Sequence, residues 1–421
     1  MIKLLLGGSP CTYWSIAQKN NREVEPSGLG WELFKNYLIA KEKFKPDFFL
    51  YENNKSAAQA IKDQIKKELK AWNGTLLMED TGARYIEINS ALVSAQNRQR
   101  FYVHNCGEVE QPEYRGILLK DILESEVGQR QQEKSRTITA GYVACSQRDM
   151  RMDIETDGFM GKQGVIEPIR IPPYGNKDKA RPLGALYASH SGTGEGSLEK
   201  RLLSDNPNKE QVDLIAEPIR VGALPRPNGE LSTSQAFRIY DINAKSVTIN
   251  AGGGGAGGKT GLYAIPADGK TYPVYEVKNG YITIKGKQYP IKLADGYYII
   301  RKLTVKECCR LQTLPDDFCR AVSPSQGYKG LGNGWTAEVI IHILNGALKD
   351  IPKDEEIVVL SMYDGIGTGR YCLDKMGFTN VKYYAYEIDK YAKQISMSNY
   401  PDIIQMGDAF DLRNPDWTIG Y

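Results

Sequence analysis

Residues 357–389 constrain the fold of this 421-residue chain most strongly. IVVLSM is an apolar run typical of a buried strand, YDGIGTG is a glycine-rich turn, and the residues after it continue as a helix. A second run, KYYAYEID, ends in acidic residues. This succession is typical of a nucleotide-binding βαβ unit, in which the glycines let the backbone approach a ligand and the acid holds a ribose. The GxGxG spacing lacks the full dinucleotide pattern and favours S-adenosylmethionine over NAD.

The front of the chain carries a cysteine on a stiff turn. MIKLLL is typical of a short buried strand, and Gly7 and Gly8 stop it. Pro10 restricts the backbone just before Cys11, so few conformations are open to this thiol. A thiol at a strand end lies where open α/β sheets bind their ligands, which makes Cys11 a candidate nucleophile. The alternative is a small, buried and inert cysteine in a tight turn.

The composition excludes several classes of protein. The chain is long enough for two or three domains, and its 41% apolar and 25% charged residues are ordinary for a globular protein. A net charge of +3 predicts that nucleic acid would bind to a local basic face. Seven scattered cysteines without a Cys-x-x-Cys pair, and only three histidines, argue against disulfides, a metal site and a histidine-based triad. Because no segment resembles a signal peptide or a membrane span, we expect a cytoplasmic protein.

Changes in composition and hydrophobic pattern divide the chain into four parts. Residues 1–106 alternate strand-like and helical stretches, whereas 107–300 are rich in glycine, proline, tyrosine and short β-like runs. Helical patterns return over 301–350, and 351–421 contain the βαβ unit and a third strand. We expect 107–300 to form a separate domain, with basic residues for nucleic acid such as Arg136, Arg148, Arg151 and Arg181.

Local patterns predict the main elements of the first part. The segment 44–54 is predicted to be a strand that ends in polar residues, and 56–74 an amphipathic helix. The segment 86–106 is predicted to be two strands around an arginine-bearing turn. Farther on, GGGGAGGKTG (252–261) has no helix after it and is predicted to be a flexible loop, not a phosphate loop.

Several separated motifs agree in kind with one enzyme family. They are GGSPC (7–11), ENN (52–54), QNRQR (96–100), LTVKECCRLQTLPDDF (303–318), GLGNGW (330–335), YDGIGTG (363–369), YEID (386–389) and GDAFDLRNPDW (407–417). In these motifs the chain resembles the C5-cytosine DNA methyltransferases, and SPCTYWS, LVSAQNRQRFY and GLGNGW are closest to the de novo animal-type enzymes. The family begins with its cofactor half, whereas here that half comes last, which predicts a circular permutation.

The resemblance implies a fold and its division into domains. We expect an α/β fold with a circularly permuted, Rossmann-like sheet of the S-adenosylmethionine-dependent methyltransferase kind and a smaller β-rich target-recognition domain. Residues 1–106 would hold the nucleophile half, 107–300 the recognition domain, 301–350 the return to the catalytic domain with its closing helix, and 351–421 the cofactor half.

The resemblance also implies roles for the catalytic residues. Cys11 would add its thiolate to C6 of cytosine, and Glu52 would hydrogen-bond or protonate N3 and bond the exocyclic amine. Arg98 and Arg100 would hold O2 and the flanking phosphate. Their alternative is a solvated pair on a strand. Asn53 is predicted to fix the nucleophile loop. Thr12 and Asn54 depart from the family pattern without removing a catalytic group.

On the cofactor side, Tyr363 replaces the usual phenylalanine and would stack on adenine. Gly365, Gly367 and Thr368 would line the methionine moiety, Glu387 the ribose, and Asp408 the adenine amine. The full set expected to bind S-adenosylmethionine is Pro10, Asn333, Gly334, Trp335, Tyr363, Asp364, Gly365, Gly367, Thr368, Glu387, Ile388, Asp408 and Ala409.

These observations predict a DNA cytosine-5 methyltransferase that flips its target base out of double-stranded DNA. We expect a monomer without metal or membrane, in a bacterial or phage-type cytoplasm, as in restriction–modification systems. An RNA cytosine-5 methyltransferase and a catalytically silent DNA-binding relative are the alternatives. The silent relative would be expected to lack the thiol or the glutamate, and both Cys11 and Glu52 are present.

Overall fold

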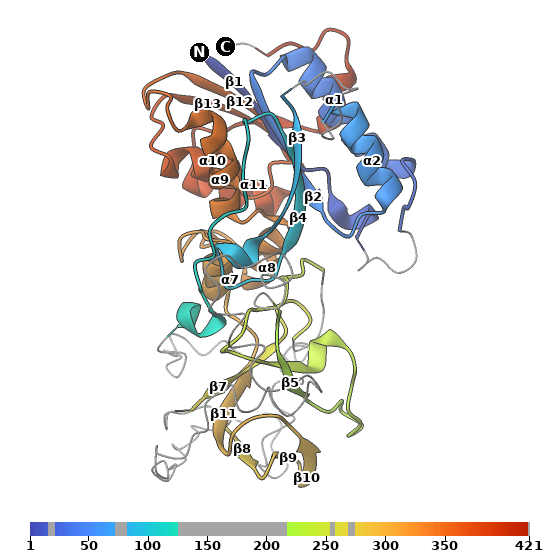
Figure 1. Ribbon diagram of the computed structural model, residues 1–421, viewed down its shortest axis with the longest axis vertical. Coiled ribbons are helices and arrows are strands. Elements are labelled where there is room, and N and C mark those ends of the chain that lie inside the picture. Colours follow the sequence, from blue (N-terminus) through green and yellow to red (C-terminus); the bar gives the residue numbers. More distant parts are fainter. Residues whose placement is uncertain (16–21, 72–81, 125–216, 253–256, 268–273, 420–421) are drawn as a thin grey trace, which may run out of the picture. The chain divides into compact units, whose positions relative to one another are not determined.

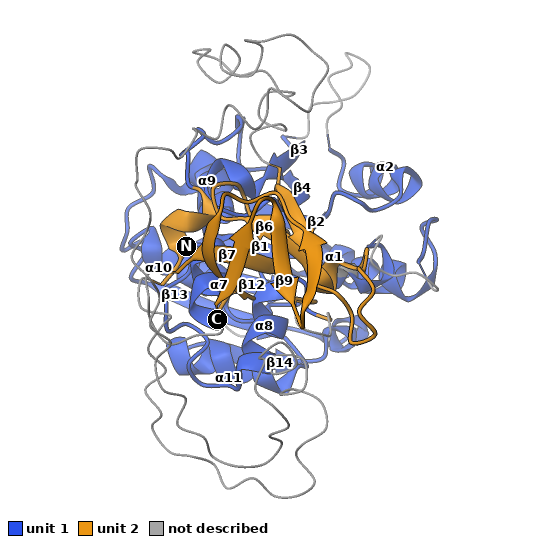
Figure 2. Ribbon diagram, turned by 90° about the horizontal axis from the view of Figure 1, so that it is seen from below, with its two compact units in different colours: residues 1–117, 248–251, 305–421 blue, residues 118–247, 252–304 orange. Residues whose placement is uncertain are grey.

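The computed structural model describes residues 1–15, 22–71, 82–124, 217–252, 257–267 and 274–419. The chain forms two compact units, coloured in Figure 2. Unit 1 contains residues 1–117, 248–251 and 305–421, and unit 2 contains 118–247 and 252–304. The composition of the sequence changes near 107 and 300, whereas the chain passes from unit 1 to unit 2 after residue 117 and returns for the last time after residue 304.

Unit 1 is built on a seven-stranded sheet with the order β14-β13-β12-β1-β2-β4-β3 (Figure 1). Neighbours from β14 to β2 pair in parallel, and β4 runs antiparallel to both β2 and β3. The bounds are β1 (Ile2–Gly7), β2 (Phe48–Asn54), β3 (Arg84–Asn89), β4 (Gln99–His104), β12 (Ile357–Met362), β13 (Val381–Tyr386) and β14 (Ile404–Gly407). Every residue of β12 is buried, which explains why the central parallel strands are continuous apolar runs.

The direction of chain progression across this sheet reverses between β12 and β1. The strands β12, β13 and β14 follow one another toward one edge, while β1 and β2 lead toward the other. The paired residues run from Ile2 opposite Ile357 to Gly7 opposite Met362, so the two strands end together. In open α/β sheets, ligands bind at the carboxyl ends of strands at such a switch point. The glycine turns after β1 and β12 therefore begin next to each other, at the carboxyl ends of these two strands.

Unit 1 also contains several helices. They are α1 (Gly28–Phe44), α2 (Gln59–Glu68), α7 (Val305–Leu311), α8 (Pro324–Asn333), α9 (Ala337–Leu348), α10 (Thr368–Lys375) and α11 (Lys390–Asn399), with the 3-10 helices η1 (Cys11–Tyr13), η2 (Ser90–Leu92) and η6 (Ala409–Arg413). The helix predicted over 56–74 is shorter as α2, because Lys70 adopts a left-handed φ of 54° just after it. GLGNGW spans the end of α8 and the turn to α9.

The described part of unit 2 is a second seven-stranded sheet, ordered β10-β9-β8-β11-β7-β6-β5. Its elements are η3 (Leu119–Ile122), η5 (Gln235–Phe237), β5 (Arg220–Ala223), β6 (Arg238–Asp241), β7 (Leu262–Pro266), β8 (Tyr275–Lys278), β9 (Tyr281–Ile284), β10 (Lys287–Pro290) and β11 (Gly296–Arg301). Positive φ angles at Asn279-Gly280 and Lys285-Gly286 give the two tight hairpins that join β8, β9 and β10.

Some predictions fall outside the described residues. Residues 125–216 include all four arginines named above for nucleic-acid binding, and residues 253–256 belong to the predicted glycine loop. Those predictions stay predictions.

Candidate active site

The loop after β1 is tied to the neighbouring strand β2. The side chain of Asn53 donates hydrogen bonds to the carbonyl and Oγ of Ser9 at 3.0 and 3.2 Å. The hydroxyl groups of Ser9 and Tyr51 are 2.7 Å apart. Ser9 and Asn53 are both buried, so this small network fixes the loop two residues before Cys11. Cys11 begins η1, and its side chain lies outside the described part of the structure.

Glu52 lies directly against this loop. A Cβ atom built on Gly8 would lie 2.7 Å from the carbonyl oxygen of Glu52 and 3.0 Å from its Oε2. Only glycine allows this approach without a shift. The sequence therefore needs glycine at position 8 because the acid on β2 packs onto the turn.

Two further side chains hold the Glu52 carboxylate, one at each oxygen. Nε of Arg100 lies 2.9 Å from Oε1, and the side chains of this ion pair are 8% and 11% exposed. The indole N–H of Trp335 donates to Oε2 at 3.1 Å. Glu52 faces Tyr102 across the β2–β4 ladder, so Arg100, two residues away, projects from the same side of the sheet. Three segments distant in sequence thus meet at one carboxylate.

Arg98 occupies a different position from Arg100. Its Nη2 donates to the carbonyl oxygens of Gly332 and Gly334 at 3.2 and 2.7 Å. The residue is buried and precedes β4. Arg98 therefore fixes the end of α8 and the turn that carries Trp335.

The turn after β12 has the backbone of a ligand-binding loop. Tyr363, Gly365 and Gly367 have φ angles of 59°, 65° and 83°. Below the turn, Oδ1 of Asp364 accepts hydrogen bonds from Ser361 and Tyr383, both at 2.7 Å. Burial raises the pKa of Asp364, because the charged form loses its hydration there. The Asp364 carboxylate thus braces the turn from inside.

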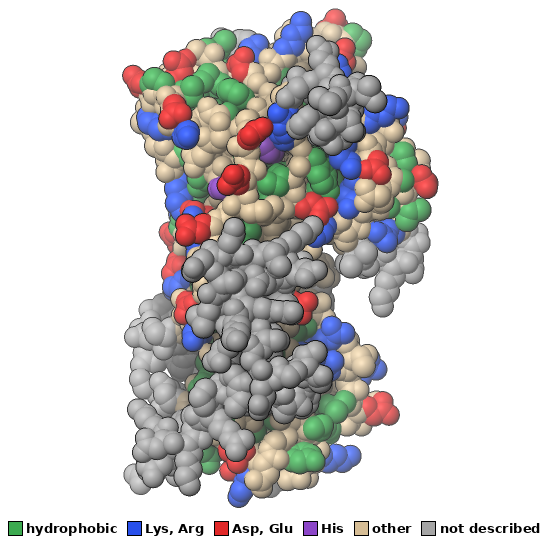
Figure 3. Space-filling model, viewed as in Figure 1, with side chains coloured by type: hydrophobic (Ala, Val, Ile, Leu, Met, Phe, Trp, Pro, Cys, Tyr) green, Lys and Arg blue, Asp and Glu red, His purple; other side chains and the backbone are tan. Residues whose placement is uncertain are grey.

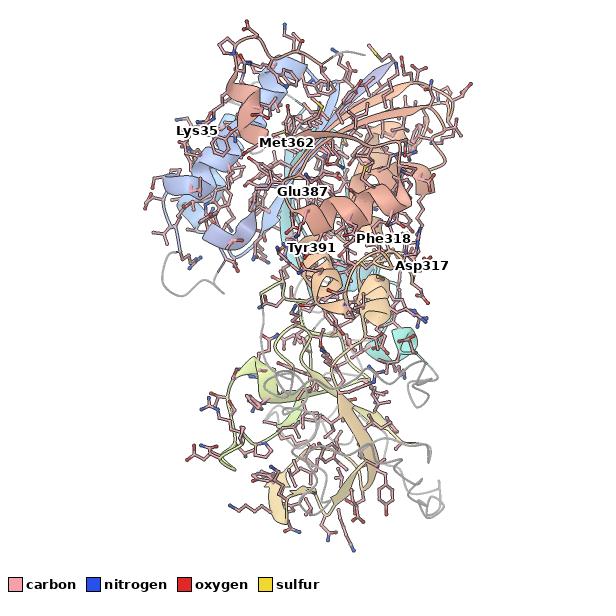
Figure 4. All side chains as sticks on the ribbon, turned by 180° about the vertical axis from the view of Figure 1, so that it is seen from behind. Lys35, Asp317, Phe318, Met362, Glu387 and Tyr391 are labelled. Carbon is pink, nitrogen blue, oxygen red and sulfur yellow. The ribbon has the colours of Figure 1, made fainter. Side chains whose placement is uncertain are left out.

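Glu387, at the end of β13, contacts the same turn. Its Oε2 accepts from the backbone N–H of Gly365 at 2.9 Å, and its Oε1 accepts from the N–H groups of Ile388 and Asp389 at 2.8 and 2.7 Å. Burial raises the pKa of Glu387 in spite of these donors. Figure 4 labels Glu387 and Met362 at the ends of neighbouring strands. Since each carboxylate oxygen accepts two hydrogen bonds, Oε2 has capacity for a ligand hydroxyl.

The remaining predicted cofactor residues lie around these strand ends. Ile388 is 71% exposed, which is unusual for an isoleucine, while Ala409 is buried. Asp408 follows β14 and caps η6 by accepting from the N–H of Phe410 at 3.0 Å. The hydroxyl group of Thr368 is buried and has no hydrogen-bond partner among the residues that the structure describes. Pro10 and Asn333 are exposed, and Gly334 is half-buried.

Sequence reasoning missed several polar residues of this site. Asn36 on α1 is fully buried and contacts Tyr363. Gln312, the residue directly after α7, donates a hydrogen bond from its side chain to the carbonyl of Leu331 at 2.7 Å. Gln96 is fully buried, and within the described part of the chain neither polar atom of its amide has a hydrogen-bond partner. The segment around Asn36 is not predicted as a helix, so the polar residue within that apolar stretch gives no usable signal.

The described residues offer neither a metal-binding cluster nor a membrane-spanning helix. Within the ranges that the structure covers, no group of three or more histidines, cysteines or acids could hold a metal ion. Nor does any helix in those ranges combine the length and apolarity that a bilayer crossing requires.

One known protein family matches this chain. The model of the C-5 cytosine-specific DNA methylase family matches residues 1–349. The chain belongs to this family. Membership implies S-adenosylmethionine-dependent methylation of cytosine in DNA. No curated protein matches the methylase. The matched range ends before β12, the strand that leads into the glycine turn.

Proposed function

We propose that this methylase transfers a methyl group to C5 of a flipped-out cytosine in double-stranded DNA, at a specific site, through a bond between Cys11 and C6. The observation that best supports this proposal is the position of Glu52. Its carboxylate is held by Arg100 and Trp335, and it packs on Gly8 of the loop that leads to Cys11. A fixed acid beside a nucleophile loop is what addition to a cytosine ring requires.

The proposed chemistry assigns one task to each group. The Cys11 thiolate adds to C6, and the C5–C6 π electrons become available at C5. Glu52 bonds N3 and the exocyclic amine and draws charge away from the ring as the adduct forms. After C5 has accepted the methyl group, a water molecule takes the C5 proton, the electron pair of the C5–H bond forms the C5–C6 double bond, and the Cys11 thiolate is expelled. The nucleophile is thereby regenerated.

S-adenosylmethionine supplies the electrophilic methyl group, and the residues after β12 and β13 fit this cofactor. The Thr368 hydroxyl, which has no partner among the described residues, can bond the methionine moiety. Apart from its chain neighbours, no atom of the described residues lies within 4 Å of a Cβ placed on Gly365, which leaves room for a ligand. The free acceptor capacity of Glu387 suits a ribose hydroxyl. The exposed Ile388 offers apolar surface to adenine, and Asp408, which follows the neighbouring strand β14, is proposed to bond the adenine amine. Tyr363 is proposed to stack on that ring.

Arg100 and Arg98 are proposed to act differently. Arg100 touches Glu52 and is the candidate for charge stabilisation at the base. Arg98 binds two backbone carbonyls near Trp335, which supports a positioning role. The proposal thus gives different roles to two arginines for which the sequence motif implies the same role.

Unit 2 is proposed to bind the DNA duplex. Residues 217–304 contain twelve lysines and arginines against six acids, whereas the whole chain has a net charge of only +3. Figure 3 shows several lysine or arginine side chains on the visible face of the described part of this unit. Basic side chains would contact phosphates, and a few others would read base edges.

The order of the halves is proposed to be a circular permutation. The strands β12, β13 and β14 come last in the chain but share a sheet with β1 and β2. The family match over residues 1–349 is consistent with this, since it excludes that C-terminal part. In this proposal a single cofactor site is assembled from both ends of the chain.

The test of this function is covalent trapping. The wild-type protein is incubated with S-adenosylmethionine and duplex DNA containing 5-fluorocytosine, whose C5 fluorine blocks the last elimination. We expect a denaturation-resistant protein–DNA band, which Cys11→Ser cannot form although it still binds DNA. A band of equal strength with Cys11→Ser would refute the assignment. Bisulfite sequencing of treated plasmid then identifies product and site.

Parallel substrates separate the alternatives. Trapping on a matched RNA instead of DNA would favour an RNA methyltransferase. Binding of DNA without trapping or methylation would favour the silent relative.

A further inference from the structure

The hydroxyl group of Tyr363 is bonded at the first position of the glycine turn. It donates to the carbonyl oxygen of Leu33 at 2.7 Å and accepts from Nδ2 of Asn36 at 3.3 Å. Both partners belong to α1, the helix that follows the nucleophile loop. A stacking role would need only the aromatic ring. Stacking on adenine alone therefore does not explain this tyrosine.

The contact continues through Asn36 to the segment after β14. Oδ1 of the fully buried Asn36 accepts from Nε of Arg413 at 2.7 Å. Nη2 of Arg413 donates to the backbone carbonyl and to Oε2 of Glu32, at 3.1 and 2.9 Å. Arg413 is the last residue of η6, whose first turn Asp408 caps. One buried asparagine thus links the glycine turn to the segment proposed to hold adenine.

The backbone of Tyr363 needs such support. Its φ of 59° is in the left-handed region, which is strained for a bulky side chain. Burial raises the pKa of Tyr363 well above its ordinary range, so the hydroxyl keeps its proton and remains a donor to Leu33. The ring is thereby held at two points, the strained backbone and the anchored hydroxyl.

We propose that Tyr363, Asn36 and Arg413 form a positioning network that fixes the turn after β12 and the segment after β14 in the geometry that binds S-adenosylmethionine. This inference rests on the proposed function. The three side chains act through the cofactor site and touch neither Glu52 nor its partners by any recorded hydrogen bond of the described residues. They should therefore set cofactor affinity rather than the chemical step.

The test is Tyr363→Phe, which keeps the ring and removes only the hydroxyl group. Calorimetric titration with S-adenosylhomocysteine should show a Kd raised by about three- to tenfold, the usual effect of a lost buried hydrogen bond. Arg413→Ala, at a half-exposed end of the network, should raise it similarly, and the double variant should be less than additive. KM for S-adenosylmethionine should rise with Kd, while kcat stays within about twofold.

Tyr289→Phe is the matched control, since that hydroxyl also donates to a backbone carbonyl, of Gly229 at 3.0 Å, but in unit 2. It should lower thermal stability without changing Kd. Wild-type affinity in both Tyr363→Phe and Arg413→Ala would overturn the positioning network, even if Tm falls. Wild-type protein that fails to bind S-adenosylhomocysteine would overturn the proposed function itself.

Discussion

Replacing Trp335 by phenylalanine separates two roles that one side chain combines. The sequence places Trp335 with the cofactor residues, but its indole N–H donates to Oε2 of Glu52 at 3.1 Å. Phenylalanine keeps most of the aromatic surface and loses only this donor. If the hydrogen bond orients the acid for catalysis, Trp335→Phe should lower kcat and leave cofactor binding nearly unchanged.

The size of the effect follows from the contacts of Glu52. A hydrogen bond to a charged group contributes about 1.5–3 kcal/mol, and each 1.4 kcal/mol is about tenfold in rate. Arg100 still holds Oε1 in the variant, so we expect the lower end of this range. The predicted loss is about tenfold in kcat, with KM for S-adenosylmethionine changed by less than about threefold.

The assay is steady-state transfer of tritiated methyl groups to a plasmid at saturating DNA. Trp417→Phe is the matched control, because that indole donates to the neutral hydroxyl of Tyr386 at 2.7 Å. Its kcat should match the wild type. An unchanged kcat in Trp335→Phe, or a large rise in KM alone, would refute the role assigned to this hydrogen bond.

Two further predictions concern the turns after β1 and β12. Gly8→Ala should destabilise the fold by about 1–3 kcal/mol and abolish most activity, since its Cβ would displace Glu52. Urea unfolding measures the change in stability, and initial methylation rates measure the change in activity. Wild-type values in both assays would contradict the packing argument. Burial raises the pKa of Asp364 above its ordinary 3.8, so its contribution to stability is present below that value and is lost as pH rises through the raised pKa. Asp364→Asn should not show this loss of stability with rising pH. The free energy of unfolding of the wild type and of the variant, measured from acid to neutral pH, tests this. The same pH dependence in both proteins would contradict the prediction.

Several elements of this protein are predictable because their causes are local. The run predicted at 1–6 forms most of β1, whose last four residues are buried, and the run at 357–362 forms the fully buried β12. The glycines of the turn after β12 have the positive φ angles that favour glycine. Helix ends are less predictable. The pattern over 56–74 is longer than α2, since periodicity continues past the residue at which the backbone leaves the helix.

The candidate site shows the same division. The sequence indicates that Glu52, Arg98 and Arg100 matter, because their residue types and spacing match a known motif. It cannot tell that Arg100 pairs with Glu52 while Arg98 binds the carbonyls of Gly332 and Gly334. That difference depends on which segment packs above each arginine.

By itself the sequence determined the chemical repertoire of this protein: a thiol on a stiff turn, an acid at a strand end, and a glycine turn suited to a nucleotide. Only the tertiary structure decided which of these groups meet. The indole of Trp335 reaches Glu52 across 283 residues of chain, and Ile2 pairs with Ile357 in the sheet. Such contacts are set by how the whole chain buries its apolar faces and pairs its strands, and no local pattern of residues specifies that arrangement.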